Sequence, residues 1–391
     1  MRRWVCAAMG VALVGAACTS GGAPGGSGQF VLRDTSQIVL DEERSYNAFE
    51  LTSELDYYVN NAYECGLSGN YSFFVMNPAG APDANAPLWV YLHGGGVGYY
   101  GDEGDYVALT FQDENAWNHQ ESFDALIGIV EERVFAGDGQ PEDQTLVRRI
   151  EDGYRVLVVS YCDHDQYSGL GTSYTNHPTN PNAQVNGLQA TMAAIDYVAA
   201  NYPTTQVWAH GTSAGSTGVW SLASSYGQEG TALTGVVADS TIMSPRLVDL
   251  IDALKGTPGF PFGAEFETQG VTDKIGYFAD PQSPSLPEAQ IANQDFRSVP
   301  VFFVYGLMDV FCGGDMAPIP EASAAGLTNC EYFFADLEAA VDSQVDSPHE
   351  VHALNEGHVP TLDPGTANDL VDDFIDRVLA TNPPNFGSLN G

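Results

Sequence analysis

The sequence has few basic residues. Its 391 residues include 13 lysines and arginines against 51 aspartates and glutamates, which gives a formal net charge of −38 at pH 7. Such a surface repels the phosphates of nucleic acids and the headgroups of anionic lipids, so we expect no nucleic-acid partner. We interpret the acidic excess as a solvated surface that has no specific function of its own.

Long apolar runs are also missing. After two N-terminal arginines comes "VALVGAA" (11–17), which is too short to span a bilayer and predicts an export signal over residues 1–18. The small residues before Cys18 are similar to a bacterial lipoprotein signal, in which Cys18 is lipidated at the cell surface. Ordinary secretion with cleavage nearby is the alternative. Residues 19–30 then form a flexible linker, and membrane contact is expected only through such a lipid anchor.

Cysteines are scarce. Besides Cys6 in the signal and Cys18, four remain for the folded domain: Cys65, Cys162, Cys312 and Cys330. An even number in an exported protein predicts two disulfides, with three possible pairings. Cys312 and Cys330 are close in sequence, and a bond across a loop of that size would stabilise the fold by roughly 3 kcal/mol. We therefore expect these two to pair, and Cys65 to pair with Cys162.

Over residues 31–391, apolar runs alternate with helical patterns. Helical spacing occurs at 183–202 and 368–380, and the stretches 98–150 and 246–298 fit neither pattern. Unbroken apolar runs predict strands buried on both faces, and their alternation with helices predicts one α/β domain with a mostly parallel sheet. The two irregular stretches are expected to be lid or cap insertions. The predicted strands cover residues 88–92, 156–161, 206–210, 235–239, 301–306 and 349–355.

Ser213 lies in "GTSAG" (211–215), between a predicted strand and a predicted helix. In an α/β sheet, G-x-S-x-G in this context is the nucleophile elbow of the α/β-hydrolase fold. The pentapeptide alone is weak evidence in a chain with 42 glycines. Upstream, "YLHGGG" (91–96) ends another predicted strand. Its glycines offer backbone N–H groups for an oxyanion hole, and we expect the donors at Gly95, Gly96 and Ala214. A plain glycine turn is the alternative.

A serine nucleophile needs a histidine base, and that base needs an acid that orients it. The chain order in this fold is serine, acid, histidine. Asp309 follows the strand 301–306 and is the first candidate acid, before Asp315 and Asp239. His358 lies just beyond the carboxyl end of the last predicted strand and is the expected base. His349 lies at the start of that strand, and His352 lies within it.

Taken together, these segments resemble the pectin acetylesterase and Notum-type carboxylesterase family of the α/β-hydrolase superfamily. The similarity lies in separated islands over about residues 88–360. The resemblance implies a triad of Ser213, Asp309 and His358, and an esterase without a cofactor. The islands are "LHGGG", "VVSYCDHDQYSG" (158–169), "GTSAGSTG", "VVADS", "VYGLMD" and "NEGH".

The charge also bears on the substrate. A strongly acidic protein repels a polyanionic glycan, which favours neutral acetylated polysaccharides or small acyl esters. No metal is expected, because His349 and His352 in "HEVH" are three residues apart, whereas a helical zinc pair needs four. Two alternatives stay open: a surface-anchored binding protein on an inactive hydrolase fold, and a serine peptidase of the same fold. The oligomeric state is not predicted.

Overall fold

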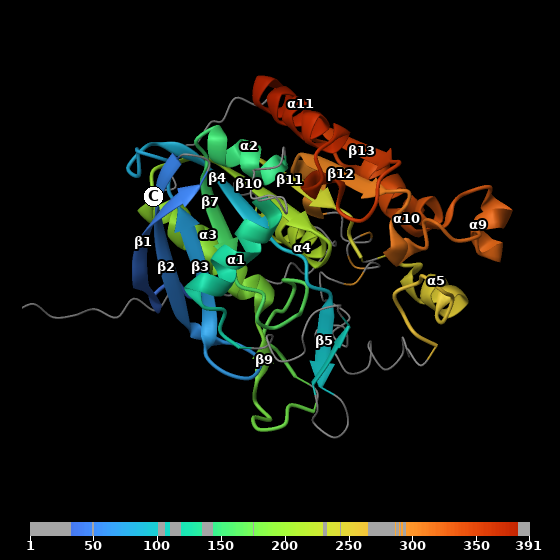
Figure 1. Cartoon of the computed structure of the whole chain (residues 1–391), viewed down its shortest axis with the longest axis horizontal. Helices are drawn as coiled ribbons and strands as arrows, with labels where there is room; N and C mark the ends of the chain where they lie inside the picture. Colours follow the sequence, from blue (N-terminus) through green and yellow to red (C-terminus); the bar gives the residue numbers. More distant parts are fainter. Residues whose placement is uncertain are drawn as a thin grey trace, which may run out of the picture.

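The structure is a computed structural model of the whole chain (Figure 1). The expected export signal, Cys18, the linker and large parts of both expected insertions lie outside the described residues. Described are residues 33–48, 51–100, 106–109, 119–134, 144–174, 176–229, 233–242, 244–264 and 295–381, with the single residues 286, 289 and 291.

A nine-stranded sheet runs through the molecule in the order β1-β2-β3-β7-β4-β10-β11-β12-β13 (Figure 1). The pairs β1–β2, β2–β3 and β3–β7 are antiparallel, and every pair from β7 to β13 is parallel. The parallel strands therefore end at one edge of the sheet. The strands are β1 (Ile38–Ala48), β2 (Leu51–Glu64), β3 (Asn70–Met76), β4 (Ala86–Leu92), β7 (Arg155–Val159), β10 (Thr204–Thr212), β11 (Gly235–Asp239), β12 (Val301–Gly306) and β13 (His349–Leu354).

Helices cover both faces of this sheet. One face packs against α3 (Gly187–Asn201), α4 (Ala214–Glu229), α5 (Leu247–Leu254) and α10 (Asn329–Gln344). The other packs against α1 (Phe123–Val134), α2 (Thr145–Glu151) and α11 (Thr366–Thr381). The remaining elements are α9 (Pro320–Ala325), the strand pairs β5 (Val97–Tyr100) with β6 (Tyr106–Leu109) and β8 (Thr172–Ser173) with β9 (Gln184–Val185), and the short 3-10 helices η1 (Asp295–Ser298), η2 (Val310–Cys312) and η3 (Pro360–Leu362).

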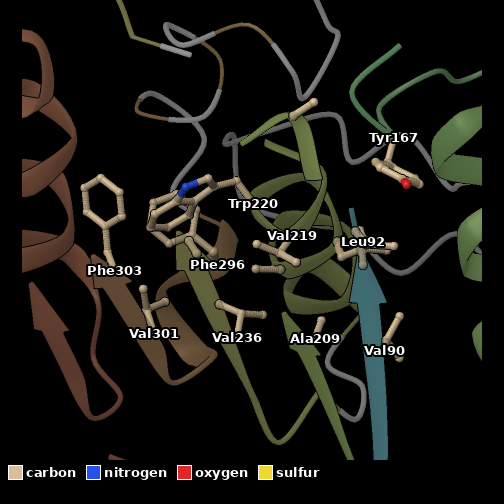
Figure 2. Packing of buried hydrophobic residues seen from close by; sticks show 14 of the residues in the cluster. Val90, Leu92, Tyr167, Ala209, Val219, Trp220, Val236, Phe296, Val301 and Phe303 are labelled. Atoms are coloured by element: carbon tan, nitrogen blue, oxygen red, sulfur yellow. The ribbon is translucent and has the colours of Figure 1, made fainter. Parts of the chain in front are cut away.

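The alternation of side chains along each strand explains the two cores. In β4, Leu88, Val90 and Leu92 join the core under α3 and α4, whereas Trp89 and Tyr91 join the core under α1, α2 and α11. Successive residues of a strand point to opposite faces, so a strand covered on both sides needs an unbroken apolar run. Figure 2 shows the first core, in which side chains from several strands meet Val219 and Trp220 of α4.

This arrangement is the α/β-hydrolase fold that the sequence predicted. The six predicted strands correspond to β4, β7, β10, β11, β12 and β13, and the helical patterns to α3 and α11. Strands β1 to β3 were not predicted. Within the two expected insertions, the described helices α1, α2 and α5 contribute residues to the cores.

Candidate active site

Ser213 lies in the sharp turn between β10, which ends at Thr212, and α4, which begins at Ala214. Its φ is 54°, in the left-handed region that non-glycine residues rarely adopt. Strained residues of this kind concentrate at functional turns. The turn places a partly exposed serine at the carboxyl edge of the sheet, where the helix begins.

Two glycines make this turn possible. A Cβ atom on Gly211 would lie 2.0 Å from the carbonyl oxygen of Gly215, and one on Gly215 would lie 1.9 Å from that of Leu92. Both distances are far below van der Waals contact, so any side chain here would push α4 away from β4 and β10. Close backbone packing therefore requires the two glycines of the G-x-S-x-G motif, Gly211 and Gly215.

The glycine loop after β4 lies directly against Ser213. A Cβ atom on Gly94 would lie 2.9 Å from the Cβ of Ser213. The carbonyl of Gly94 is 2.7 Å from Nδ1 of His93, and the Tyr161 hydroxyl donates to the carbonyl of Gly96 at 2.7 Å. Sequence reasoning named Gly95 and Gly96 and missed Gly94, whose role is to let the loop approach the serine.

The contact between Nδ1 of His93 and the carbonyl of Gly94 also sets the direction of the N–H group of Gly95. In a trans peptide the C=O and N–H groups point in opposite directions, so the N–H of Gly95 points away from His93. Ala214, another of the three expected donors, is the first residue of α4, where backbone N–H groups have no partner within the helix. Gly95 and Ala214 thus lie on the two backbone segments that meet at Ser213.

Asp309 and His358 are hydrogen-bonded. Nδ1 of His358 is 2.7 Å from Oδ2 of Asp309, which is 2% exposed, and the other Asp309 oxygen accepts from the backbone N–H of Phe311 at 2.8 Å. The Phe311 ring lies 4.5 Å from the imidazole. With Nδ1 donating to the carboxylate, Nε2 is left as the basic nitrogen, and it has no hydrogen-bond partner among the described residues.

The other candidates have different surroundings. His349 lies at the start of β13, where its Nδ1 is 3.0 Å from the carbonyl of Ser347. His352 contacts Glu350, with Nε2 2.9 Å from Oε2. Asp315 is exposed. Asp239 is fully buried, which raises its pKa to about 7, and its carboxylate accepts hydrogen bonds from Thr361.

The end of β11 is bonded both to the turn that carries Ser213 and to the loop that carries His358. The N–H of Ser213 donates to the carbonyl of Asp239 at 2.9 Å. The next residue, Ser240, accepts through Oγ from the N–H of Val359, which follows His358, at 3.0 Å. Two adjacent residues, Asp239 and Ser240, therefore bind the serine turn and the loop of residues 357–362, here called the histidine loop. Ser213 and His358 lie 145 positions apart in the chain.

Both expected disulfides are formed, between Cys65 and Cys162 and between Cys312 and Cys330. The second lies beside the candidate acid, because its two sulfur atoms are 3.4 and 3.6 Å from the carbonyl oxygen of Asp309. This bond therefore braces the loop that carries Asp309. In the part of the chain that the structure describes, no helix has both the length and the apolar character to cross a membrane.

Comparison with family models and with curated proteins gives no match. Among solved structures, the chain is similar to an S-formylglutathione hydrolase from Agrobacterium tumefaciens, with 10% identity, a TM-score of 0.46, and 86% of this chain and 98% of that chain covered. It is also similar to acetyl xylan esterase 1 from Thermoanaerobacterium sp. JW/SL YS485, with 14% identity, a TM-score of 0.44, and 88% of each chain covered. These values are too low to transfer an activity or a substrate.

Proposed function

We propose that the protein is a serine carboxylesterase that hydrolyses acyl esters. In this mechanism, Nε2 of His358 takes the proton of the Ser213 hydroxyl as its oxygen attacks the ester carbonyl. Asp309 holds the imidazole in the tautomer with its proton on Nδ1 and stabilises the imidazolium that forms. The protonated base then gives its proton to the leaving alcohol, and a water molecule releases the acid by the same steps.

The observation that carries the proposal is the bond of 2.7 Å between His358 and Asp309, with the basic nitrogen free of partners among the described residues. A buried acid that orients a histidine through Nδ1 is the pairing that serine activation needs. The strained turn at Ser213 and the glycine loop packed against it support the same mechanism. Backbone donors near Gly95, Gly96 and Ala214 would each contribute about 3 kcal/mol to oxyanion stabilisation.

We further propose that the substrate is a neutral acetylated polysaccharide or a small acyl ester. A net charge of −38 repels polyanionic glycans, although salt weakens that repulsion. Two disulfides fit a protein that works outside the cytosol, in line with the expected export signal. Attachment through Cys18, and the pectin acetylesterase and Notum-type family, belong to the same proposal.

The test is hydrolysis of short-chain p-nitrophenyl esters. We expect Ser213→Ala to lower kcat on the order of 10⁶-fold, the cost of losing a serine nucleophile. Ser216→Ala is the matched control, because this buried serine in the next turn has no side-chain hydrogen bond among the described residues and its loss should leave kcat unchanged.

Three outcomes would contradict the proposal. Wild-type turnover by Ser213→Ala would reject the nucleophile. Failure of the wild type to react with a fluorophosphonate would favour a binding protein on an inactive fold. Faster hydrolysis of peptide amides than of esters would indicate a peptidase.

A further inference from the structure

The residue after His358 has a strained backbone. Val359 has a φ of 57°, and a β-branched residue with positive φ is a genuine outlier. The next residue is Pro360, which restricts the backbone of the residue before it still further. Such a conformation persists only where the surrounding structure holds it.

Two side chains at the end of β11 hold the loop. Ser240 Oγ accepts from the N–H of Val359 at 3.0 Å. Oδ2 of Asp239 accepts from the N–H of Thr361 at 2.8 Å and from its hydroxyl at 2.5 Å. Asp239 and Ser240 are fully buried. Proline has no N–H, so both backbone donors that flank Pro360 are bound by this pair of residues.

The same pair binds the turn that carries the serine. The carbonyl of Asp239 accepts from the N–H of Ser213 at 2.9 Å, and the N–H of Ser240 donates to the carbonyl of Val304 in β12 at 2.9 Å. Ser240 itself has a φ of 54°. The Asp239–Ser240 connector is thus anchored in the sheet and bonded on one side to the serine turn and on the other to the histidine loop.

His210 extends the connector to β10. The Thr361 hydroxyl donates its hydrogen to Asp239, so it accepts from the N–H at Nε2 of His210, 3.0 Å away. Burial lowers the pKa of His210 to about 3, so this ring is neutral and carries its single proton on Nε2. With Asp239 ionised, the Asp239–Thr361–His210 chain therefore has one consistent arrangement of hydrogens.

We propose that Asp239, Ser240 and Thr361 are positioning residues that set the geometry between Ser213 and His358, an inference that rests on the proposed function. Among the described residues, neither Asp239 nor Ser240 nor Thr361 forms a side-chain hydrogen bond with the Ser213 hydroxyl or with the imidazole of His358. They act through the backbone on either side of the reacting groups, and they hold Val359 in a conformation that its own sequence disfavours.

The kinetic test compares three threonine variants. Thr361→Val removes the hydroxyl at nearly constant volume, and we expect kcat to fall between about 10- and 100-fold with KM nearly unchanged, as for a small misplacement of catalytic groups. Thr361→Ser restores the hydroxyl and should restore most of kcat. The matched control is Thr145→Val, since Thr145 is also buried and its hydroxyl donates to Asn368 of α11 at 2.7 Å and not to Asp239.

The proposal is overturned if Thr361→Val retains wild-type kcat, if Thr361→Ser is as impaired as Thr361→Val, or if Thr145→Val loses as much activity. The last result would mean that any buried threonine bond matters equally.

A second measurement does not depend on activity. Hydrogen–deuterium exchange of the segment 357–362 should be faster in Ser240→Ala and Thr361→Val than in the wild type, and unchanged in Thr145→Val. Unchanged exchange in both Ser240→Ala and Thr361→Val would overturn the proposal, whatever the wild type hydrolyses. If Ser240→Ala and Thr361→Val exchange faster but the wild type has no esterase activity, the connector is supported and only the proposed function is rejected.

Discussion

Two buried carboxylates, Asp163 and Asp165, interact in the loop that follows β7. Asp165 accepts hydrogen bonds from the backbone N–H groups of Tyr167, Gly169 and Gly187 at 2.7 to 2.9 Å. Asp163 accepts from the N–H of Asn186 at 2.7 Å. Burial raises the pKa of both carboxyl groups, but the three backbone donors oppose this rise at Asp165, whereas the neighbouring charge raises the pKa of Asp163 further. Asp163 is therefore the member that holds a proton.

This proton makes stability depend on pH. The unfolded chain releases it above about pH 4, whereas the folded protein retains it, so the free energy of unfolding falls as the pH rises from about 4 toward the raised pKa. Asp163→Asn keeps an acceptor for Asn186 and has no proton to lose. We expect the loss of stability between pH 5 and pH 8, measured by urea unfolding, to shrink by at least about 1.4 kcal/mol, the equivalent of one pKa unit.

The control for that prediction is Asp373→Asn, which removes one charge from an exposed position on α11. It should keep the wild-type dependence on pH. If both variants lost stability with pH as steeply as the wild type, the buried pair would not be the source of the effect.

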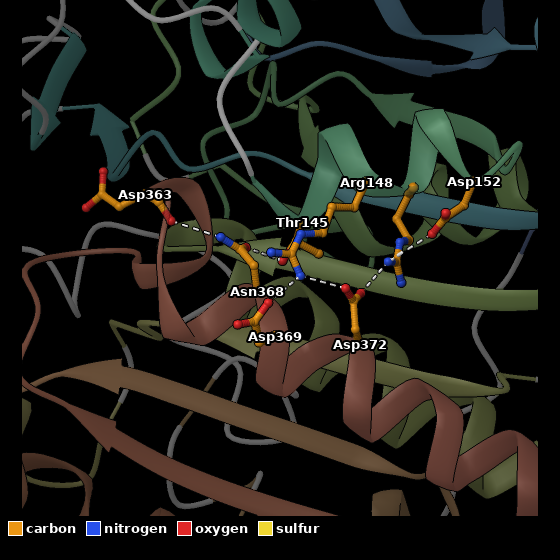
Figure 3. Close-up of polar contacts among 8 residues, drawn as sticks. Thr145, Arg148, Asp152, Asp363, Asn368, Asp369 and Asp372 are labelled. Atoms are coloured by element: carbon orange, nitrogen blue, oxygen red, sulfur yellow. Dashed lines mark hydrogen bonds and ion pairs between the residues drawn. The ribbon is translucent and has the colours of Figure 1, made fainter.

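At the scale of elements, a network of ion pairs connects α11 to α2 (Figure 3). Asp372 of α11 accepts from Arg148 at 2.6 Å and also from Arg149, whose side chain is only 4% exposed. Arg149 has a further partner in Asp152 at 3.1 Å. Because α11 follows the histidine loop directly, this network fixes the helix at the end of that loop.

Replacing Asp372 tests how much this network contributes to stability. Asp372→Asn leaves the buried Arg149 with Asp152 as its remaining charged partner among these contacts, and we expect the free energy of unfolding to fall by about 1.5 to 3 kcal/mol, the typical value of a hydrogen bond to a charged group. The neighbouring exposed variant Asp373→Asn should change it by less than about 0.5 kcal/mol. Equal effects in chemical denaturation would show that the network contributes nothing.

The elements that the sequence predicted share one property. Strands covered on both faces must be apolar throughout, so β4, β7, β10, β11 and β12 could be located without knowledge of their partners. The pattern is weaker in β1, whose solvent-exposed residues interrupt the apolar ones. In β3, "FFVM" is completely buried, but an apolar run this short is only a weak indication of a strand.

The candidate site was predictable only in part. Ser213 and the glycine loop have local motifs, and the expected order of acid and base singled out Asp309 and His358. The connector has no such signal, because the bonds of Asp239 to Thr361 join residues 122 positions apart. The strain at Val359 results from these tertiary contacts, and no local rule assigns a valine before proline to that conformation.

At the scale of the whole molecule, the two disulfides close loops of very different length. Cys65 and Cys162 are 97 positions apart and join the end of β2 to the segment after β7, whereas Cys312 and Cys330 are 18 apart. The longer loop restricts the unfolded chain more strongly when it is closed. The two bonds should therefore differ in what they contribute to the stability of the fold.

We expect the double variant Cys65→Ser/Cys162→Ser to lose about 4.7 kcal/mol of unfolding free energy, and Cys312→Ser/Cys330→Ser to lose about 3 kcal/mol, from loop closure alone. Urea unfolding of both variants gives the comparison. The smaller loop braces Asp309, so its variant should lose kcat on p-nitrophenyl esters as well, whereas the larger loop should affect stability more than turnover. The reverse order of stabilities would mean that native-state contacts around the sulfur atoms outweigh the restriction of the unfolded chain.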